Sequence, residues 1–349
     1  MTCLHLPHKV ADFACPINGL EDMYEWKTGF RLPGYFLMDL SMMGFGYIKQ
    51  KNAPSPRLVF WGTGTGRPQH ELLADIIGYC WTCSEGKSFP ASWKLVRQSL
   101  ERGFPVILGL IDMYHLPYYP RFYHTVHIPQ HYVLLVGCDE VKQVAYVQDN
   151  GLTEVQSIPL TDLKEAWNVN VPRQGKKNTL FILEFNDRIA TLEEIVTKGL
   201  KKKANLILNP PVGFMGIKGL RKLCADITNW PRELTEKQME DSLTSLVTFT
   251  CSVVPMLPQR LLPFKLNQPD NHNAVRDRFS RELLGFADQF NHPEWEEPAS
   301  LLAKSGRLIG QLTEIFTDQL LKKSYDMNAA VPLITEIADL EKKAFHLLA

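Results

Sequence analysis

The sequence of 349 residues predicts an α+β domain built on an antiparallel sheet, followed by an all-α domain. Two observations carry this prediction. Up to residue 187, short apolar runs typical of strands alternate with helical patterns, and two of these runs form a hairpin pattern. Beyond that point, apolar residues recur only at the three- and four-residue spacing of helices. We therefore expect one domain at residues 1–187 and a second at residues 188–349.

Charge and cysteine content narrow the class of protein. Lysine plus arginine, at 38, equals aspartate plus glutamate, so no overall field favours nucleic acid or an anionic membrane as partner. The seven cysteines show no disulfide framework, and the N-terminal stretch lacks the pattern of a secretory signal. No apolar run approaches the roughly 18 residues that a membrane crossing needs. These features predict a cytoplasmic protein with reduced thiols.

The clearest local pattern is a β-hairpin in the first domain. Residues 132–138 are almost all apolar, residues 143–149 are rich in Val and Tyr, and charged residues separate the two runs. Because His131 and Asp149 are equidistant from Glu140, an antiparallel pair folded there places them opposite each other. A histidine oriented by an acid is two-thirds of a site that activates a nucleophile.

A cysteine near the N-terminus is the candidate nucleophile. The stretch FACPINGLEDMYEW, residues 13–26, predicts a helix, because Pro16 is tolerated in a first turn and the apolar residues follow helical spacing. Cys15 would then be the N-cap, where the helix dipole favours a thiolate and free N–H groups could hold an oxyanion. The alternative is an ordinary buried cysteine.

The chain order of these three residues is the papain-like order: a cysteine on an early helix, then a histidine on a strand, then an acid on the next strand. We therefore predict a papain-like fold with the catalytic triad Cys15, His131 and Asp149. Asn150 is the fallback for the third position. His124 and His127 are competitors for the second, but neither opens a strand whose partner ends in an acid.

Two other motifs favour structural interpretations. Residues 62–66, GTGTG, superficially suggest a phosphate-binding loop but lack the Lys-Ser/Thr of a P-loop, so a glycine-rich connection is favoured. Cys80 and Cys83 form a CxxC that could be a redox pair or half a zinc site. No second such pair accompanies it, and it ends a helical pattern, so structural cysteines are favoured. The sequence therefore predicts neither a bound cofactor nor a metal.

The remaining elements follow from local patterns. In the first domain we expect a helix at 92–102, a strand at 105–111, a helix at 158–168 with Thr161 as N-cap, and a strand at 178–185. Residues 112–124, dense in aromatics and proline, are either the wall of an acyl or amine pocket or a packed surface loop. Helices of the second domain are expected at 192–204, 216–229, 236–254, 274–290, 298–322 and 331–347.

Five segments together resemble a known family: FACPINGL, VILGLIDMYHLPYY, HYVLLVGCDE, AYVQDN and IPLTDLKEAW. Their order, with a helical second half, is similar to the butirosin biosynthesis protein H family, in which a papain-like domain precedes a helical domain. The resemblance spans essentially the whole chain and is strongest over residues 104–167. Carried over by position, the family's Cys, His and acid fall on Cys15, His131 and Asp149.

The resemblance implies an acyltransferase of antibiotic or other natural-product biosynthesis. Such an enzyme takes an acyl group from the phosphopantetheine thioester of an acyl or peptidyl carrier protein, holds it on cysteine and forms an amide with a small-molecule amine. It needs no cofactor beyond that carrier. In the second domain, Lys198 and Lys201 to Lys203 are a candidate docking site for an acidic carrier, or simply a solvated helix face.

The chain departs from the family pattern in two places. Many members have His before the cysteine and Ser-Gly after it, whereas Ala14 and Pro16 flank Cys15 here. In the helical domain, residues 270–276 replace a glycine-rich stretch followed by Arg. A cysteine peptidase or amide hydrolase with the same triad is the main alternative, and a non-catalytic binding protein of the same fold is a second one.

Overall fold

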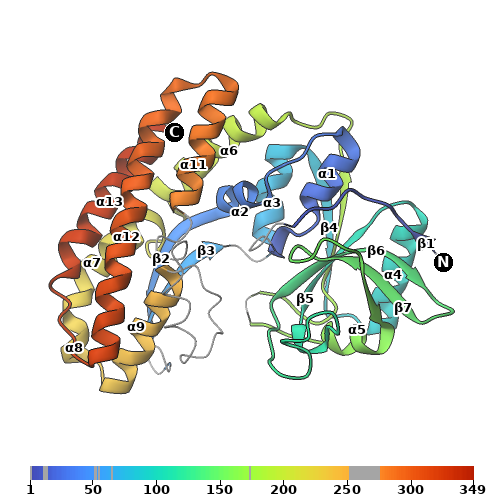
Figure 1. The fold of residues 1–349 in the computed structure, drawn as a ribbon, viewed down its shortest axis with the longest axis horizontal. Helices are drawn as coiled ribbons and strands as arrows, with labels where there is room; N and C mark the ends of the chain where they lie inside the picture. The colour runs from blue at the N-terminus through green and yellow to red at the C-terminus, as the bar shows by residue number, and fades with distance from the viewer. Residues whose placement is uncertain are drawn as a thin grey trace. The chain divides into compact units, whose positions relative to one another are not determined.

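The structure is a computed structural model that describes residues 2–10, 15–50, 53, 56–63, 66–172, 174–250 and 276–349. It combines antiparallel sheets with many helices and has a helical C-terminal region (Figure 1). The chain divides into two compact units. Unit 1 comprises residues 1–41 and 64–195, and unit 2 comprises residues 42–63 and 196–349.

In the described part of unit 1, seven strands form one antiparallel sheet in the order β4-β9-β5-β6-β7-β8, with β1 paired to β6. The strands are β1 (Thr2–Cys3), β4 (Tyr79–Ser84), β5 (Val106–Ile111), β6 (His131–Asp139), β7 (Val144–Gln148), β8 (Gln156–Pro159) and β9 (Leu180–Phe185). The helices are α1 (Leu20–Thr28), α2 (Gly34–Ser41), α3 (Gly66–Ile77), α4 (Phe89–Glu101) and α5 (Leu160–Ala166), with 3-10 turns η1 (Cys15–Ile17) and η2 (Met113–His115). The predicted antiparallel sheet is confirmed.

Strand β6 is the centre of this sheet, and every one of its residues is buried. Alternate side chains point to opposite faces, so Val133 and Leu135 join the core formed with Trp93 of α4 and Trp167 after α5. On the other face Leu134 packs against Gly19 just before α1. A β-carbon at Gly19 would lie 2.7 Å from Leu134, and the residue has φ of 87°, so only glycine fits there. Helix α1 is thereby held close to β6.

The position of the CxxC motif and the start of the helix expected at 158–168 were predicted wrongly. Cys80 and Cys83 lie in strand β4, paired with β9, rather than at the end of a helix. The helix expected at 158–168 begins at Leu160, after β8, and Pro159 rather than Thr161 precedes it. Pairing with the neighbouring strand keeps both stretches extended, and a local helical pattern does not reveal such pairing.

Unit 2 contains helices together with a β-hairpin from earlier in the chain. The hairpin is β2 (Met42–Lys49) with β3 (Arg57–Thr63). The helices are α6 (Leu192–Leu208), whose first turn lies in unit 1, α7 (Gly216–Asp226), α8 (Trp230–Glu233), α9 (Glu236–Thr250), α11 (Arg276–Phe290), α12 (Glu296–Lys322) and α13 (Ala330–Leu347), with η3 (Ile227–Asn229) and η6 (Pro293–Trp295). The described residues after 195 are thus helical, as expected.

The predicted division at residue 187 misassigns the hairpin, and the unit is not all-α. Asp226 at the end of α7 explains why residues 42–63 belong to unit 2. Its carboxylate accepts hydrogen bonds from Tyr47 of β2 and Arg57 of β3. Lys203 of α6 donates to the backbone oxygen of Met42 at 3.1 Å. These buried polar contacts fix the hairpin to the helices.

The hydrogen bond of Lys203 to Met42 removes this lysine from the docking site expected for a carrier protein. Lys203 is 1% exposed and its ammonium lies over the ring of Phe279, 5.2 Å from the centroid. It is therefore a core residue rather than a surface charge. Lys198 and Lys201 are exposed.

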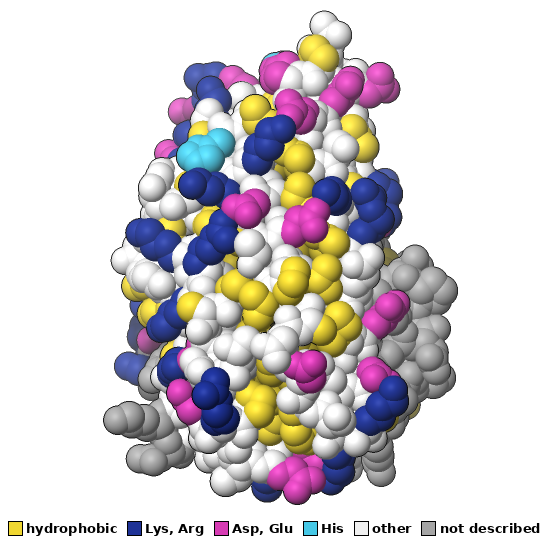
Figure 2. Space-filling view, turned by 90° about the vertical axis from the view of Figure 1, so that its left-hand side faces the viewer, with side chains coloured by type: hydrophobic (Ala, Val, Ile, Leu, Met, Phe, Trp, Pro, Cys, Tyr) yellow, Lys and Arg dark blue, Asp and Glu magenta, His cyan; other side chains and the backbone are white. Residues whose placement is uncertain are grey.

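Helix α13 lies on the side of the molecule that Figure 2 turns to the viewer, where a band of hydrophobic side chains runs between Lys and Arg side chains. A shallow groove on this helix is lined by Val331, Pro332, Thr335, Glu336, Asp339, Leu340 and Lys343. Both long helices of the region, α12 and α13, bury one stripe and expose the other. Among the described residues, no helix combines the length and apolarity required to cross a membrane.

A buried ion pair holds three helices of unit 2 together. Arg276 of α11 donates two hydrogen bonds to Glu341 of α13, at 2.6 and 3.0 Å. Ser305 of α12 donates to the same carboxylate at 3.0 Å. Both charged side chains are almost completely buried, at 1% and 2% exposed. Removing either partner of this buried pair is therefore costly.

Replacing Glu341 with Ala should lower the free energy of unfolding by about 3–5 kcal/mol, because the buried guanidinium of Arg276 loses a carboxylate that accepts two of its hydrogen bonds. Urea denaturation followed by circular dichroism measures this loss. The double variant Arg276→Met/Glu341→Leu is the control and should be close to wild type, since it removes both charges and keeps the volume. A double variant as unstable as the single one would contradict this reading.

Candidate active site

The structure brings the three predicted residues together within unit 1. Cys15 opens the turn η1, His131 is the first residue of β6, and Asp149 directly follows β7. The Nε2 atom of His131 lies 2.7 Å from Oδ2 of Asp149. Cys15 lies near enough to the same ring to contribute to raising the pKa of His131. The sulfur, the imidazole and the carboxylate are thus brought to one place, with His131 paired directly to Asp149.

The hairpin register differs from the expected one. Leu134 pairs with Gln148, so His131 and Asp149 are not directly opposite but diagonal across the two strands. The connecting loop spans residues 140–143, and Asp139 pairs with Val144. An irregularity between Leu135 and Gly137 then moves the pairing back by one residue toward the expected register. Diagonal neighbours remain within reach of long side chains, which is why the imidazole and carboxylate still meet.

The expected N-cap position of Cys15 is wrong. Cys15 begins a 3-10 turn of three residues, and α1 starts only at Leu20, after the left-handed Gly19. The packing of Leu134 against Gly19 forces this break. No long helix therefore begins at the sulfur, so the helix dipole expected to favour a thiolate there is missing.

Four hydrogen bonds hold the Asp149 carboxylate, which is completely buried. Besides His131, the hydroxyls of Tyr118 and Tyr119 donate to it at 2.9 and 3.0 Å, and the Gly151 amide at 3.4 Å. Burial acts to raise the pKa of Asp149, but the charge of His131 and these hydrogen bonds hold it below its ordinary value. The carboxylate is therefore anionic at neutral pH.

His131 carries the complementary charge. Burial acts to lower its pKa, but the charge and hydrogen bond of Asp149, and then the hydrogen bond and charge of Cys15, raise that pKa to about 10. The ring edge of Tyr119 also packs against it, with centroids 6.0 Å apart. The imidazole is thus an imidazolium at neutral pH, beside a partly exposed sulfur. This is the charge state that stabilises a nucleophilic thiolate.

The competing residues lie elsewhere. His127 pairs with Asp112 at 2.7 Å and is exposed, and His124 stacks on Tyr123. Asn150 is buried directly after the acid, and the ring of His131 pairs with Asp149. The aromatic segment 112–124 supplies Tyr118 and Tyr119 as hydrogen-bond donors to Asp149. Its expected role as the wall of an acyl or amine pocket stays a prediction.

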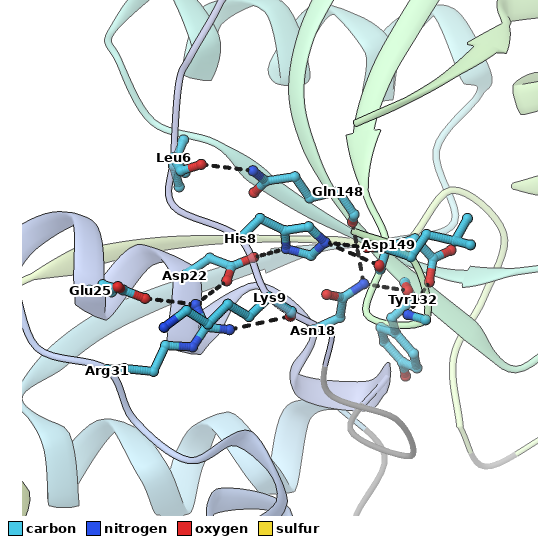
Figure 3. Close-up of polar contacts among 12 residues, drawn as sticks. Leu6, His8, Lys9, Asn18, Asp22, Glu25, Arg31, Tyr132, Gln148 and Asp149 are labelled. Atoms are coloured by element: carbon cyan, nitrogen blue, oxygen red, sulfur yellow. Dashed lines mark hydrogen bonds and ion pairs between the residues drawn. The ribbon is translucent and has the colours of Figure 1, made fainter. Parts of the chain in front are cut away.

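Sequence reasoning did not identify the residues that position the three groups. Tyr118 and Tyr119 are visible in the sequence only as part of an aromatic run. Asn18 sits one turn after Cys15, and its side-chain amide donates to the backbone oxygens of Tyr132 and Gln148, at 3.0 and 3.4 Å (Figure 3). It thereby links the cysteine turn to both strands of the hairpin. The signal available in the sequence was a polar residue, Asn18, three positions after the candidate nucleophile.

The remaining motifs take structural roles. Cys80 and Cys83 are both free thiols and, three apart in a strand, point to opposite faces. The preference for structural cysteines over a redox pair or half a zinc site stays a prediction. Across the described ranges, no three His, Cys, Asp or Glu side chains gather in a way that could hold a metal ion. Of the glycine-rich motif 62–66, residues 64 and 65 lie outside the described residues, as do residues 270–275.

Replacing Tyr118 with Phe removes one hydrogen bond to a buried carboxylate. The free energy of unfolding should fall by about 1.5–3 kcal/mol, the usual range for a hydrogen bond to a charged group. Tyr123→Phe, in the same loop as Tyr118, is the matched control. The Tyr123 hydroxyl donates to Asp162 of α5 at 3.4 Å, and its loss should lower the free energy of unfolding by less than about 0.5 kcal/mol. Equal losses in the two variants, measured by urea denaturation, would count against a special role for the Asp149 contact.

Comparison with known proteins gives two family matches. Residues 14–150 match the family described as "Butirosin biosynthesis protein H, N-terminal". Residues 161–251 match a "Domain of unknown function (DUF4872)". No curated protein matches the chain. The first match contains Cys15, His131 and Asp149 within its bounds.

Proposed function

Because residues 14–150 belong to the butirosin biosynthesis protein H N-terminal family, named for an antibiotic pathway, we propose that this chain is a cysteine-dependent acyltransferase. It would move an acyl group from a carrier-protein phosphopantetheine thioester to an amine and form an amide. The observation that carries the proposal is the meeting of Cys15 with His131, whose ring pairs with the buried carboxylate of Asp149. An arrangement of this kind activates a thiol for attack on a carbonyl group.

A papain-like arrangement is part of the proposal. Three features support it: the chain order, the histidine that opens a sheet strand, and the pairing of that histidine with Asp149 close to Cys15. In this arrangement Cys15 is the nucleophile, His131 carries the proton, and Asp149 orients and stabilises the imidazolium.

The first half of the reaction loads the enzyme. The Cys15 thiolate attacks the thioester carbonyl carbon, and the bond from that carbon to the pantetheine sulfur breaks. His131 gives its proton to the departing sulfur, so pantetheine leaves as a thiol. An S-acyl Cys15 remains beside a neutral imidazole.

The second half uses the same imidazole as a base. The charge of Cys15 is one of the contributions that raise the pKa of His131, and acylation removes it. His131 then accepts the proton of the attacking amine while the amide forms and the Cys15 thiolate leaves. The resting pair of thiolate and imidazolium is restored. Because conversion of a thioester to an amide is downhill, this scheme needs no nucleotide.

Incubating the protein with an acyl-loaded carrier protein tests the proposal. Intact-protein mass spectrometry should show an acyl adduct on the wild type, and Cys15→Ala should show none because the acceptor sulfur is missing. Cys80→Ala is the matched control and should still acquire the adduct, since Cys80 is an exposed thiol without a histidine partner.

Other outcomes would favour the alternatives. A wild type that never takes up an acyl group from any thioester but cleaves peptides or amides would be a hydrolase using the same three residues. Absence of both activities would indicate a binding protein.

The acylation rate should depend on pH through His131. With its pKa at about 10, the proton needed by the leaving thiol is present at neutral pH and is lost as pH rises through that value. The rate of single-turnover acylation should therefore be maintained up to about pH 10 and should decline above that pH. In Asp149→Asn the decline should begin at lower pH, because this variant lacks the carboxylate charge that raises the pKa of His131. A wild-type decline near the ordinary histidine value of about 6.5 would contradict this assignment.

A further inference from the structure

A second histidine, His8, contacts the backbone of Asp149 rather than its carboxylate. Its Nδ1 is 2.6 Å from Oδ2 of Asp22 in α1 (Figure 3). Its Nε2 lies 2.8 Å from the backbone oxygen of Leu152 and 3.2 Å from that of Asp149. His8 thus bridges α1 and the turn that carries Asp149. Its side chain is 6% exposed.

The partners of His8 determine its charge. Carbonyl oxygens can only accept hydrogen bonds, so Nε2 must carry a proton. The Asp22 carboxylate also accepts, and it is shared with the guanidinium of Arg31 at 2.6 Å, so Nδ1 carries a proton as well. Burial acts to lower the pKa of His8, but the hydrogen bond and charge of Asp22 and the two carbonyls raise it overall. His8 is therefore an imidazolium that donates from both nitrogens.

The two histidines bind opposite ends of one residue. His131 binds the side chain of Asp149, whereas His8 binds its backbone oxygen. On the other side of His8, α1 follows the turn that begins with Cys15. The direction of the carboxylate depends on where its own main chain is held, so His8 couples the acid to the element that carries the sulfur.

The N-terminal segment has further anchors along the same hairpin. Strand β1 pairs with β6, and Gln148 donates to the backbone oxygen of Leu6 at 3.0 Å. His8 is therefore presented by a segment that is fixed to both strands of the site. We propose that His8 is a positioning residue, whose pairing with Asp22 holds the Asp149 turn so that the carboxylate stays aligned with His131. The inference rests on the proposed role of the triad.

Several titratable groups surround this ring and share its response to pH. They are Glu21, Asp22 and Glu25 of α1, Arg31 after that helix, and Asp149 of the turn. Burial and the charge of Asp22 raise the pKa of Glu21 to about 7, so it is largely protonated in mildly acidic solution. A test therefore has to compare variants across a pH range rather than at one value.

Alkylation of Cys15 by iodoacetamide, followed site by site with peptide mass spectrometry from pH 5 to 9, tests the positioning role without requiring acyl transfer. Loss of alignment weakens the support that His131 gives to the thiolate. His8→Ala should therefore alkylate about 10–100-fold more slowly at pH 6, with its profile displaced to higher pH. His8→Gln, which keeps a donor for the carbonyls but no charge, should recover part of the rate. Asp22→Asn should shift the profile in the same direction, and it keeps the test available if His8→Ala does not fold.

Tyr24→Phe is the matched control. It removes another hydrogen bond between α1 and a backbone oxygen, that of Ala190 at 2.7 Å, without touching the Asp149 turn. It should alkylate like the wild type. A wild-type profile in His8→Ala, or an equal shift in Tyr24→Phe, would overturn the inference. If His8→Ala shifts the profile but the wild type takes up no acyl group, the positioning role stands and the proposed function fails.

Discussion

The buried Asp149 carboxylate is the constraint on which the site depends. Charge in a protein interior is costly unless it is paired and hydrogen-bonded, and here four donors surround one carboxylate. Those donors come from the aromatic loop, from the start of β6 and from the acid's own turn. Satisfying this one group therefore brings together parts of the chain that are far apart in sequence, and it keeps His131 charged beside Cys15.

The proposed chemistry follows from a charge balance that changes during turnover. In the proposed scheme the Asp149 carboxylate stays beside the imidazole of His131 throughout, whereas the contribution of Cys15 to the pKa of His131 is lost when the sulfur is acylated. The same imidazole would therefore donate a proton in the first half of the reaction and accept one in the second. Asp149 prevents the ring from rotating between these steps. A single histidine can thus serve both halves of an acyl transfer.

The sequence predicted β5, β6, β7 and β9, most of the helices and the meeting of Cys15, His131 and Asp149, because apolar periodicity and chain order carry that information locally. It misjudged how they meet. The break at Gly19 depends on the packing of Leu134 from a distant strand, and the diagonal pairing depends on the register between β6 and β7. The supporting donors were missed for the same reason. A tyrosine in an aromatic run or a histidine near the N-terminus becomes meaningful only when its partners, over a hundred residues away for His8, are known.

The hairpin of residues 42–63 has a consequence for synthesis on the ribosome. It is made early, yet the buried carboxylate that receives Tyr47 and Arg57 is residue 226. Until that part of the chain has emerged, the hairpin has no helices to cover it, although most of unit 1 has already been translated. The hairpin can therefore pack in its final position only after residue 226 has been translated. A fragment ending at residue 195 would leave the apolar surface of the hairpin open to chaperones or to aggregation.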